Sequence, residues 1–264
     1  MKKDVWAAGD LYEPYVGRWS RVVAKEFLAW LELPAGKTWL DIGCGTGALT
    51  QSILQHAAPS RVRGVDPSAG FIEYARAHTQ DTRASFDVED AQALKAGAGS
   101  FDAAVAGLVL NFVPKSELAA REMRRAVRSG GVVGAYVWDY AGKMELMRYF
   151  WDAAVELNAD ARALDEGIRF PLCHPEPLAA LFREAGLSGV EVRAIDAPTP
   201  FRDFEDYWTP FLGGQAPAPG YCMSLAEEKR AALRERIRAK LPFGRDGSLK
   251  LVARAWAVRG RVPT

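Results

Sequence analysis

The segment 38–49 constrains the fold of this 264-residue chain more than any other, because an apolar strand, a glycine-rich turn and a helix start follow one another without a gap. Gly43, Gly45 and Gly47 alternate directly after the apolar run. Glycines at such a place let the backbone approach a ligand at the positive end of the following helix. The segment therefore predicts a nucleotide-binding turn.

Apolar strand-like runs alternate with segments of helical period along the chain, which is typical of a parallel sheet covered by helices on both faces. The pattern indicates an α/β protein. Strands are predicted at 38–42, 62–66, 85–88, 101–108, 132–138, 190–195 and 249–258. Ser68 is expected to cap one of the intervening helices. Ser224 and Glu227 have the spacing of a capping box at the start of a helix over 224–241.

Composition narrows the class of protein and its partners. The hydrophobic content of 49% is ample for a buried core. The formal net charge of +1 gives no electrostatic field that would concentrate nucleic acid. The N-terminus lacks an apolar leader, and the longest apolar run, near 103–113, is too short to cross a bilayer. We expect a cytoplasmic protein without a nucleic-acid or membrane partner. Three widely separated cysteines, Cys44, Cys173 and Cys222, predict neither a disulfide framework nor a metal site.

The charge beside the glycine turn distinguishes two cofactor classes. The glycines, with Asp66 nineteen positions after Gly47, satisfy the dinucleotide fingerprint of an NAD-dependent oxidoreductase. Asp41, two positions before Gly43, instead places a carboxylate where a pyrophosphate would be repelled and an ammonium and a sulfonium would be attracted. No Tyr-x-x-x-Lys pair follows in the chain. The NAD alternative stays open but is disfavoured.

The turn resembles the Asp-x-Gly-x-Gly-x-Gly motif of class I methyltransferases that use S-adenosylmethionine (SAM), and the resemblance extends over 36–138. The segments 86–94 and 101–114 resemble the family's third and fourth strands with the turns that follow them. Arg128-Ser129-Gly130-Gly131 resembles the family's Arg-Pro-Gly-Gly turn, with serine in place of proline.

The resemblance implies a SAM site and a role for each matched residue. Asp66 would bind the ribose hydroxyls, Pro67 would face the adenine, and Asp90, next to Ala91, would accept a hydrogen bond from the adenine amine. Asp87 and Glu89 are expected to be solvated. The residues implied to surround SAM are Asp41, Gly43, Cys44, Gly45, Gly47, Asp66, Pro67, Asp90, Ala91 and Leu108, with Arg18 a candidate partner of its carboxylate.

The resemblance also implies the architecture and the reaction. We expect a single domain over 1–264 with a seven-stranded, mostly parallel, doubly wound Rossmann-like sheet. Its SAM-binding core would be 36–138, and insertions at 139–174 and 198–247 would cap the active site. The expected reaction is methyl transfer to a small-molecule acceptor, and a non-catalytic SAM-binding protein is the further alternative.

No catalytic residue is assigned from the sequence. Asn111, Tyr12 and Tyr15 are expected near the methyl group, and no role as a base is assigned to His174. The aromatic residues beyond position 138 are interpreted as a wall of the acceptor pocket; they are Trp138, Tyr140, Phe150, Trp151, Phe170, Tyr207, Trp208, Phe211 and Tyr221.

Overall fold

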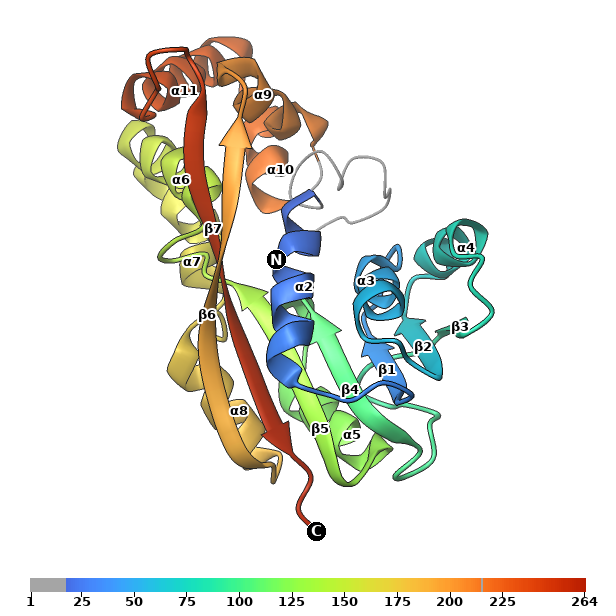
Figure 1. The fold of residues 1–264 in the computed structure, drawn as a ribbon. Coiled ribbons are helices and arrows are strands. Elements are labelled where there is room, and N and C mark those ends of the chain that lie inside the picture. The colour runs from blue at the N-terminus through green and yellow to red at the C-terminus, as the bar shows by residue number, and fades with distance from the viewer. Residues whose placement is uncertain (1–17, 215) are drawn as a thin grey trace. The chain divides into compact units, whose positions relative to one another are not determined.

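The computed structural model describes residues 18–214 and 216–264, with the side chain of Arg18 outside that description. The expectations for Tyr12, Tyr15 and the Arg18 side chain therefore lie outside the described residues. Figure 1 shows the arrangement of the strands and helices.

The described strands form one sheet in the order β3-β2-β1-β4-β5-β7-β6 (Figure 1). They are β1 (Thr38–Ile42), β2 (Arg61–Asp66), β3 (Ala84–Val88), β4 (Phe101–Gly107), β5 (Val127–Trp138), β6 (Ser188–Phe201) and β7 (Leu249–Arg261). The pairs among β1 to β5 are parallel. β7 runs antiparallel to β5, because Gly130 N donates to Val262 O while Asp139 N donates to Arg254 O. The predicted seven-stranded, mostly parallel α/β fold is confirmed.

The helices connect the strands and include several short ones. They are α2 (Arg18–Leu31), α3 (Ala48–His56), α4 (Ala69–His78), η2 (Leu110–Phe112), α5 (Ser116–Ala126), α6 (Glu145–Leu157), η3 (Ala159–Leu164), α7 (Glu166–Arg169), α8 (Pro175–Glu184), α9 (Phe204–Trp208), η4 (Thr209–Gly213), α10 (Pro217–Ser224) and α11 (Glu227–Lys240). The chain leaves β1 toward β2 on one side and pairs β1 with β4 on the other. Such a reversal of strand order opens a crevice at the carboxyl ends of the strands, where α/β proteins bind ligands.

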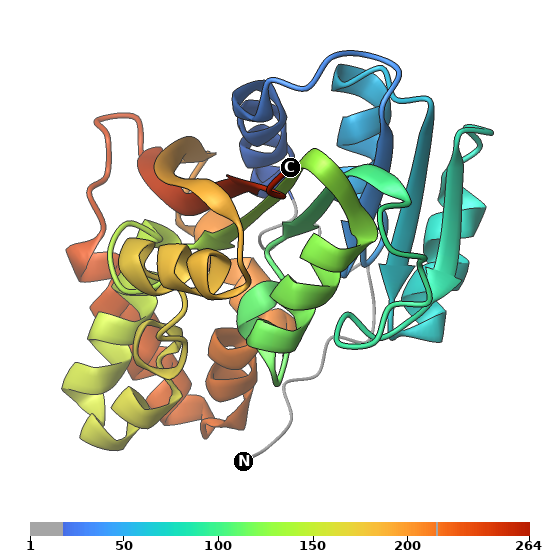
Figure 2. The same cartoon turned by 90° about the horizontal axis from the view of Figure 1, so that it is seen from below.

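The two faces of β2 differ because side chains alternate along a strand. Gly64 faces Phe86 and Cys44, and a Cβ at Gly64 would lie 2.7 Å from the Phe86 ring. Phe86 and Cys44 form a small core with Ile72 and Ala75 of α4. Arg61 and Arg63 alternate with Gly64 and so point to the opposite face. Figure 2 shows helices on both sides of the strands.

The described chain divides into two compact units. The first, here the glycine-turn unit, comprises Ser20–Val137, Leu172–Ile195 and Ala255–Thr264. The second, here the aromatic unit, contains Trp138–Pro171 and Asp196–Arg254. This division into units does not test the expectation of a single domain over 1–264, which stays a prediction.

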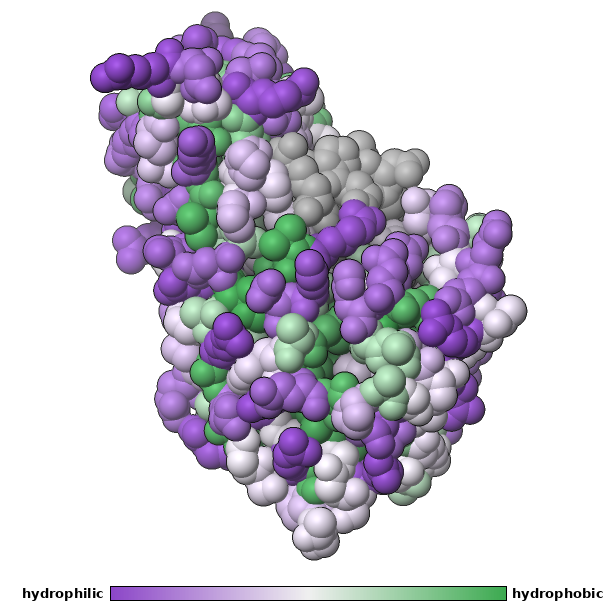
Figure 3. All heavy atoms as spheres, viewed as in Figure 1, coloured by the Kyte–Doolittle hydropathy of each residue, from purple (hydrophilic) through white to green (hydrophobic). Residues whose placement is uncertain are grey.

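The surface carries only scattered large apolar side chains, as is usual for folded proteins. Figure 3 shows hydrophilic residues over much of the face drawn, with hydrophobic residues between them. Among the described residues, the large apolar side chains that are exposed are Val22, Val88, Leu157, Leu164, Ile168, Leu212, Met223 and Phe243.

Two local predictions differ from the structure. The capping box is wrong, since Ser224 ends α10 and its hydroxyl donates to Tyr221 O at 2.8 Å. Ala226 stands at the N-cap of α11, without a side-chain cap. The strand expected at 190–195 extends over Ser188–Phe201, and three short helices, α9, η4 and α10, follow it.

Candidate functional site

The glycine turn connects β1 to α3 through three left-handed backbone conformations. Gly43, Gly45 and Gly47 have φ values of 64°, 53° and 91°. A Cβ at Gly43 would lie 2.5 Å from Val109 Cγ2, whereas one at Gly45 would meet nothing within 4 Å. The turn therefore needs glycine for its conformation at each position and, at Gly43, also for close packing. It leaves the first backbone N–H groups of α3 at the carboxyl end of β1.

Asp41 is a buried carboxylate directly before this turn. Its side chain is 0% exposed, and its Oδ2 accepts a hydrogen bond of 2.7 Å from Thr50 Oγ1 on α3. Its Oδ1 has no hydrogen-bond partner within the described chain. Burial raises the pKa of Asp41 to about 7, the bond from Thr50 opposes the rise, and the charge of Asp66 adds to it. An unpartnered buried acceptor of this kind fits a cationic donor such as an ammonium.

Asp66 ends β2 and ties that strand to the glycine turn. Its Oδ2 accepts from Gly45 N at 3.0 Å and its Oδ1 from Ser68 N at 2.9 Å. Burial raises the pKa of Asp66, and these two backbone bonds oppose the rise. A carboxylate has about four lone-pair directions, so both oxygens keep capacity to accept from vicinal hydroxyls. Ser68 caps α4 as predicted, because its hydroxyl accepts from Phe71 N.

The segment after β3 brings two carboxylates to different surroundings. Asp90 is exposed, and its carboxylate accepts from Gln92 N at 2.9 Å and from the Gln92 side chain, which lowers its pKa. Ala91 is buried. Glu89 was expected to be solvated and is instead 5% exposed, because its carboxylate accepts from Arg63 Nη2 at 2.5 Å and from Lys95 N at 3.0 Å. That expectation was wrong because the partner, Arg63, lies on a neighbouring strand.

The segment after β4 contains a strained residue and an unpartnered amide. Leu108 has a φ of 60°, and its N–H donates to Tyr136 O at 2.8 Å. A left-handed conformation at a branched apolar residue costs on the order of 1–3 kcal/mol and persists only where the surrounding structure holds it, and such residues cluster at functional sites. Asn111 follows in η2, and its Nδ2 is buried without a hydrogen-bond partner in the part of the chain that the structure describes.

Direct hydrogen bonds and packing join several of the predicted site residues. Asp66 contacts Gly45, and the N–H of Glu89 donates to Asp66 O at 3.2 Å, which links the ends of β2 and β3. Val109 packs on Gly43, which joins the turn after β4 to the turn after β1. Pro67 is exposed beside Asp66. Cys44 is buried among the glycines and faces the core around Phe86, as a small filler would.

Thr50 is a site residue that sequence reasoning missed. It holds Asp41 Oδ2 from α3, nine positions further along the chain. The signal was available, because Thr50 follows the inward-facing Leu49 at the start of a helix whose first turn lies at the end of β1. A buried polar residue at that position needs a partner, and Asp41 is within reach.

The aromatic residues beyond position 138 pack mainly against one another. Phe150 stacks on Phe211 with ring centroids 4.6 Å apart, and Tyr207, which is fully buried, donates its hydroxyl to Leu146 O at 2.7 Å. This packing makes them the core of the aromatic unit, so their burial favours a structural role over the predicted pocket wall. His174 lies at the N-cap of α8 in the glycine-turn unit and makes no side-chain cap bond there.

The comparisons with known proteins agree with this geometry. A methyltransferase domain family matches residues 40–134. A ubiquinone biosynthesis O-methyltransferase of Paraburkholderia xenovorans is 34% identical over 64% of this chain and 73% of its own length. A 2-methyl-6-phytyl-1,4-hydroquinone methyltransferase of Synechocystis is 32% identical over 47% of this chain and 39% of its own length.

A solved structure extends the likeness to the fold. The phosphoethanolamine N-methyltransferase 2 of Haemonchus contortus, in complex with SAM, has a TM-score of 0.58 at 16% identity over 92% of this chain and 53% of its own. The chain spans about half of the length, 55% and 39%, of two of the curated relatives that it matches.

The seven-stranded sheet, with a glycine turn after β1, is a Rossmann-like fold. The chain belongs to the class I SAM-dependent methyltransferase family, and SAM is the family's cofactor. Among the described residues, no helix is both long and apolar enough to span a membrane.

Proposed function

We propose that this protein transfers the methyl group of SAM to a nucleophilic atom of a small-molecule acceptor. The observation that carries the proposal is the buried carboxylate of Asp41, whose Oδ1 lacks a partner directly before the glycine turn. An ammonium at this oxygen would satisfy it and return the carboxyl to its charged form. SAM has such an ammonium, whereas the pyrophosphate of NAD would be repelled.

The other residues of the turn would hold the remaining parts of SAM. Asp66 would accept the ribose hydroxyls with its free lone pairs while keeping its bonds to Gly45 and Ser68. Asp90 would accept from the adenine amine, with Pro67 and Ala91 beside the ring. The residues proposed to surround the methionine part are Gly43, Gly45, Gly47, Leu108 and Arg18, with Cys44 taking part through its backbone because its side chain faces the core.

The protein would act mainly by positioning. When bound, SAM supplies a methyl group on a sulfonium, which is already activated toward nucleophiles. The chain's contribution is then to hold the acceptor atom about 3–3.5 Å from that methyl and to exclude water. The buried Nδ2 of Asn111 is a donor suited to orienting an acceptor oxygen. No dedicated base is proposed, and the acceptor proton would pass to water.

A small-molecule acceptor is supported by the names of the relatives, which refer to a hydroquinone and to ubiquinone biosynthesis. In the same proposal the chain is one cytoplasmic domain over 1–264, and the insertions 139–174 and 198–247 cap the acceptor side. Nucleic acid is not a proposed partner.

Transfer of label from methyl-labelled SAM to fractionated pools of small metabolites tests the proposal. We expect label in a small-molecule fraction with the wild type and at least tenfold less with Asp66→Ala at limiting SAM, since that variant loses up to two charge-assisted bonds to the ribose. The control is Asp66→Asn, which keeps the size of the side chain. Comparing the two variants separates an effect on SAM binding from an effect on the stability of the turn. SAM binding without transfer to any pool would indicate a SAM-binding sensor, and tight NAD binding without SAM binding would overturn the cofactor assignment.

A further inference from the structure

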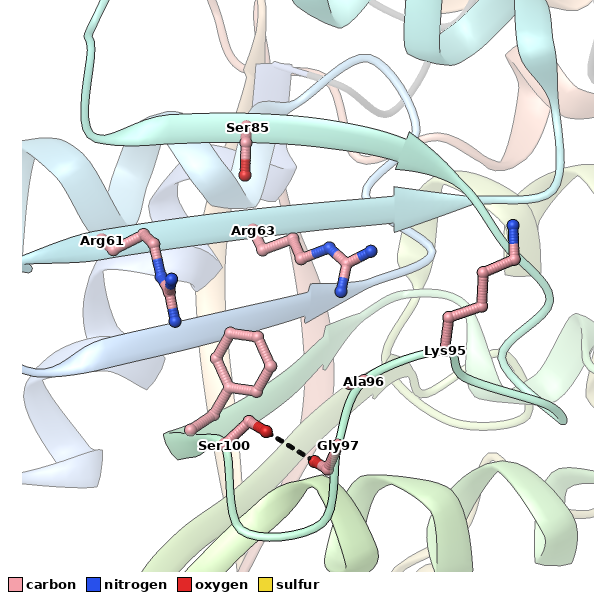
Figure 4. Close-up of a pocket in the computed structure, with 8 residues that line it drawn as sticks. Arg61, Arg63, Ser85, Lys95, Ala96, Gly97 and Ser100 are labelled. Atoms are coloured by element: carbon pink, nitrogen blue, oxygen red, sulfur yellow. Dashed lines mark hydrogen bonds between the residues drawn. The ribbon is translucent and has the colours of Figure 1, made fainter.

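A pocket of about 400 Å³ lies in the glycine-turn unit, on the face of β2 and β3 opposite to the core around Phe86. Figure 4 shows Arg61 and Arg63 of β2 and Ser85 of β3 on one side of it, with Gly97 of the β3–β4 connection opposite them and Lys95 at the end beyond Arg63, so that Arg63 lies between Arg61 and Lys95. The described residues between β3 and β4 contain no helix. These strand side chains are therefore not covered by a helix from that connection.

The β3–β4 connection is held rigidly by side chains although it has no helix of its own. Arg125 of α5 donates to Ala96 O at 2.8 Å and to Leu94 O at 2.9 Å. Glu122 accepts from Leu94 N at 2.9 Å, and Glu89 accepts from Lys95 N at 3.0 Å. Four bonds thus fix the backbone of 94–96, so this wall of the pocket is preorganised.

Three basic side chains line the pocket and two carboxylates, Asp87 and Glu89, pair with one of them, so the pocket is positive by one charge. Arg63 is matched, since its Nε lies 2.8 Å from Asp87 Oδ2 and its Nη2 lies 2.5 Å from Glu89 Oε1. Neither Arg61 nor Lys95 has an ion pair with any described carboxylate.

The Arg61 head group lies over an aromatic ring. Its guanidinium carbon lies 5.6 Å from the centroid of the Phe101 ring, which is almost fully buried. Ser85 adds an exposed hydroxyl on the same face. Within the β3–β4 connection, Ser100 Oγ donates to Gly97 O at 2.8 Å.

We propose that this pocket binds a small molecule with a phosphate monoester group. Arg61 and Lys95 supply the attraction, because charge-assisted bonds from a guanidinium and an ammonium are the strong ones for phosphate oxygens. Arg63 pairs with both Asp87 and Glu89, so these three side chains together are negative by one charge, and Arg63 contributes to the shape of the pocket rather than to its positive charge. The volume is within the range of small-molecule sites. The site shares no side chain with the proposed SAM site.

Titration of the full-length protein with glycerol 3-phosphate, followed by the amide signals of Ser85 and Gly97, tests this site. We expect saturable shifts at those amides with a Kd on the order of 1 mM, and none with glycerol. The double variant Arg61→Gln/Lys95→Gln should weaken binding at least tenfold, while Lys95→Arg, which keeps the charge, should bind as the wild type does. Arg193→Gln/Lys229→Gln removes two exposed charges elsewhere and is the matched control.

The possible results decide between the proposal and its competitors. Equal binding in the pocket variant and the control variant would overturn it, as would shifts confined to amides outside the pocket. A single-stranded oligonucleotide that displaces glycerol 3-phosphate and binds far more tightly would make the site a nucleic-acid contact instead. Unchanged SAM binding and melting temperature in the pocket variant would show that a lost phosphate signal is not lost folding, and they leave the proposed methyl transfer untouched.

Discussion

At the scale of single residues, Asp41 makes the proposed cofactor site sensitive to pH. Burial raises its pKa to about 7, so below pH 7 the free protein holds it mostly neutral, and a neutral carboxyl attracts an ammonium poorly. A bound ammonium would lower that pKa again. Affinity for SAM should therefore rise with pH up to about 7 and level off above it.

This dependence is measurable by calorimetry at pH 6 and pH 8. With a pKa near 7, about one tenth of Asp41 is ionised at pH 6, so binding to the wild type should be roughly tenfold weaker there than at pH 8. Asp41→Asn should weaken binding at pH 8 by about 1–3 kcal/mol and abolish the difference between the two pH values. An Asp41→Asn protein that binds SAM normally but melts much earlier would make Asp41 a structural residue.

Glu166 in the aromatic unit predicts a pH effect on stability. It is fully buried, its carboxylate accepts from Trp151 Nε1, and burial raises its pKa to about 7, while Arg148 opposes and Asp165 adds to the rise. The folded state therefore binds more protons than the unfolded state between about pH 4.5 and 7. Over that window Glu166 contributes progressively less to stability as pH rises, and its contribution is constant above it.

Glu166→Gln tests this assignment, because a glutamine there can still accept from Trp151 but cannot ionise. The free energy of unfolding of the variant minus that of the wild type should increase between pH 4.5 and 7, by about 3 kcal/mol, and then stay level. The exposed Glu228→Gln is the control and should show no such trend. A flat difference for Glu166→Gln in urea unfolding would contradict the raised pKa.

At the scale of elements, the glycine turn allows two neighbouring glycines to be compared. Gly43→Ala and Gly45→Ala both force alanine to a positive φ, but only the first also meets Val109. We expect Gly43→Ala to cost about 1–3 kcal/mol more stability than Gly45→Ala, because overpacking adds to the strain that both share. Equal melting temperatures for the two variants would show that Val109 moves aside freely.

Sequence and structure agree best where the signal is local. The strand 38–42 is as predicted and Ser68 caps its helix, because a short apolar run and a capping serine depend on neighbours in the chain. The capping box at Ser224 failed because Pro217 to Ser224 form a helix of their own, which occupies that serine. A capping motif does not reveal whether the preceding residues are already helical.

The less predictable features depend on contacts distant in the chain. Glu89 is buried because Arg63, on another strand, pairs with it, and neither position alone indicates this. The position of Asp41 before the glycine turn predicts that its charge attracts a cation. That its Oδ1 lacks a hydrogen-bond partner among the described residues is visible only in the structure. The aromatic residues could be grouped by sequence as neighbours in space, but burial, not composition, decides whether they form a core or a pocket.

At the scale of the whole molecule, the two units give a way to separate stability from cofactor binding. Tyr207→Phe removes the hydroxyl that donates to Leu146 O inside the aromatic unit. We expect the free energy of unfolding to fall by about 1–2 kcal/mol, since a buried hydrogen bond to the carbonyl of Leu146 is lost. SAM affinity, measured by calorimetry, should be unchanged, and a large loss of affinity would place Tyr207 in the functional site.

The position of β3 at one end of the sheet has a consequence for behaviour in concentrated solution. An edge strand offers unpaired backbone groups to another chain and can seed aggregation. Charged side chains lie along this edge, because Asp87 on β3 pairs with Arg63 and approaches Arg76, and Val88 is the exposed large apolar residue of the strand. Asp87 thus places a charge on this edge that opposes strand-to-strand association between molecules. Neutralising Asp87 would therefore promote aggregation before it altered the fold.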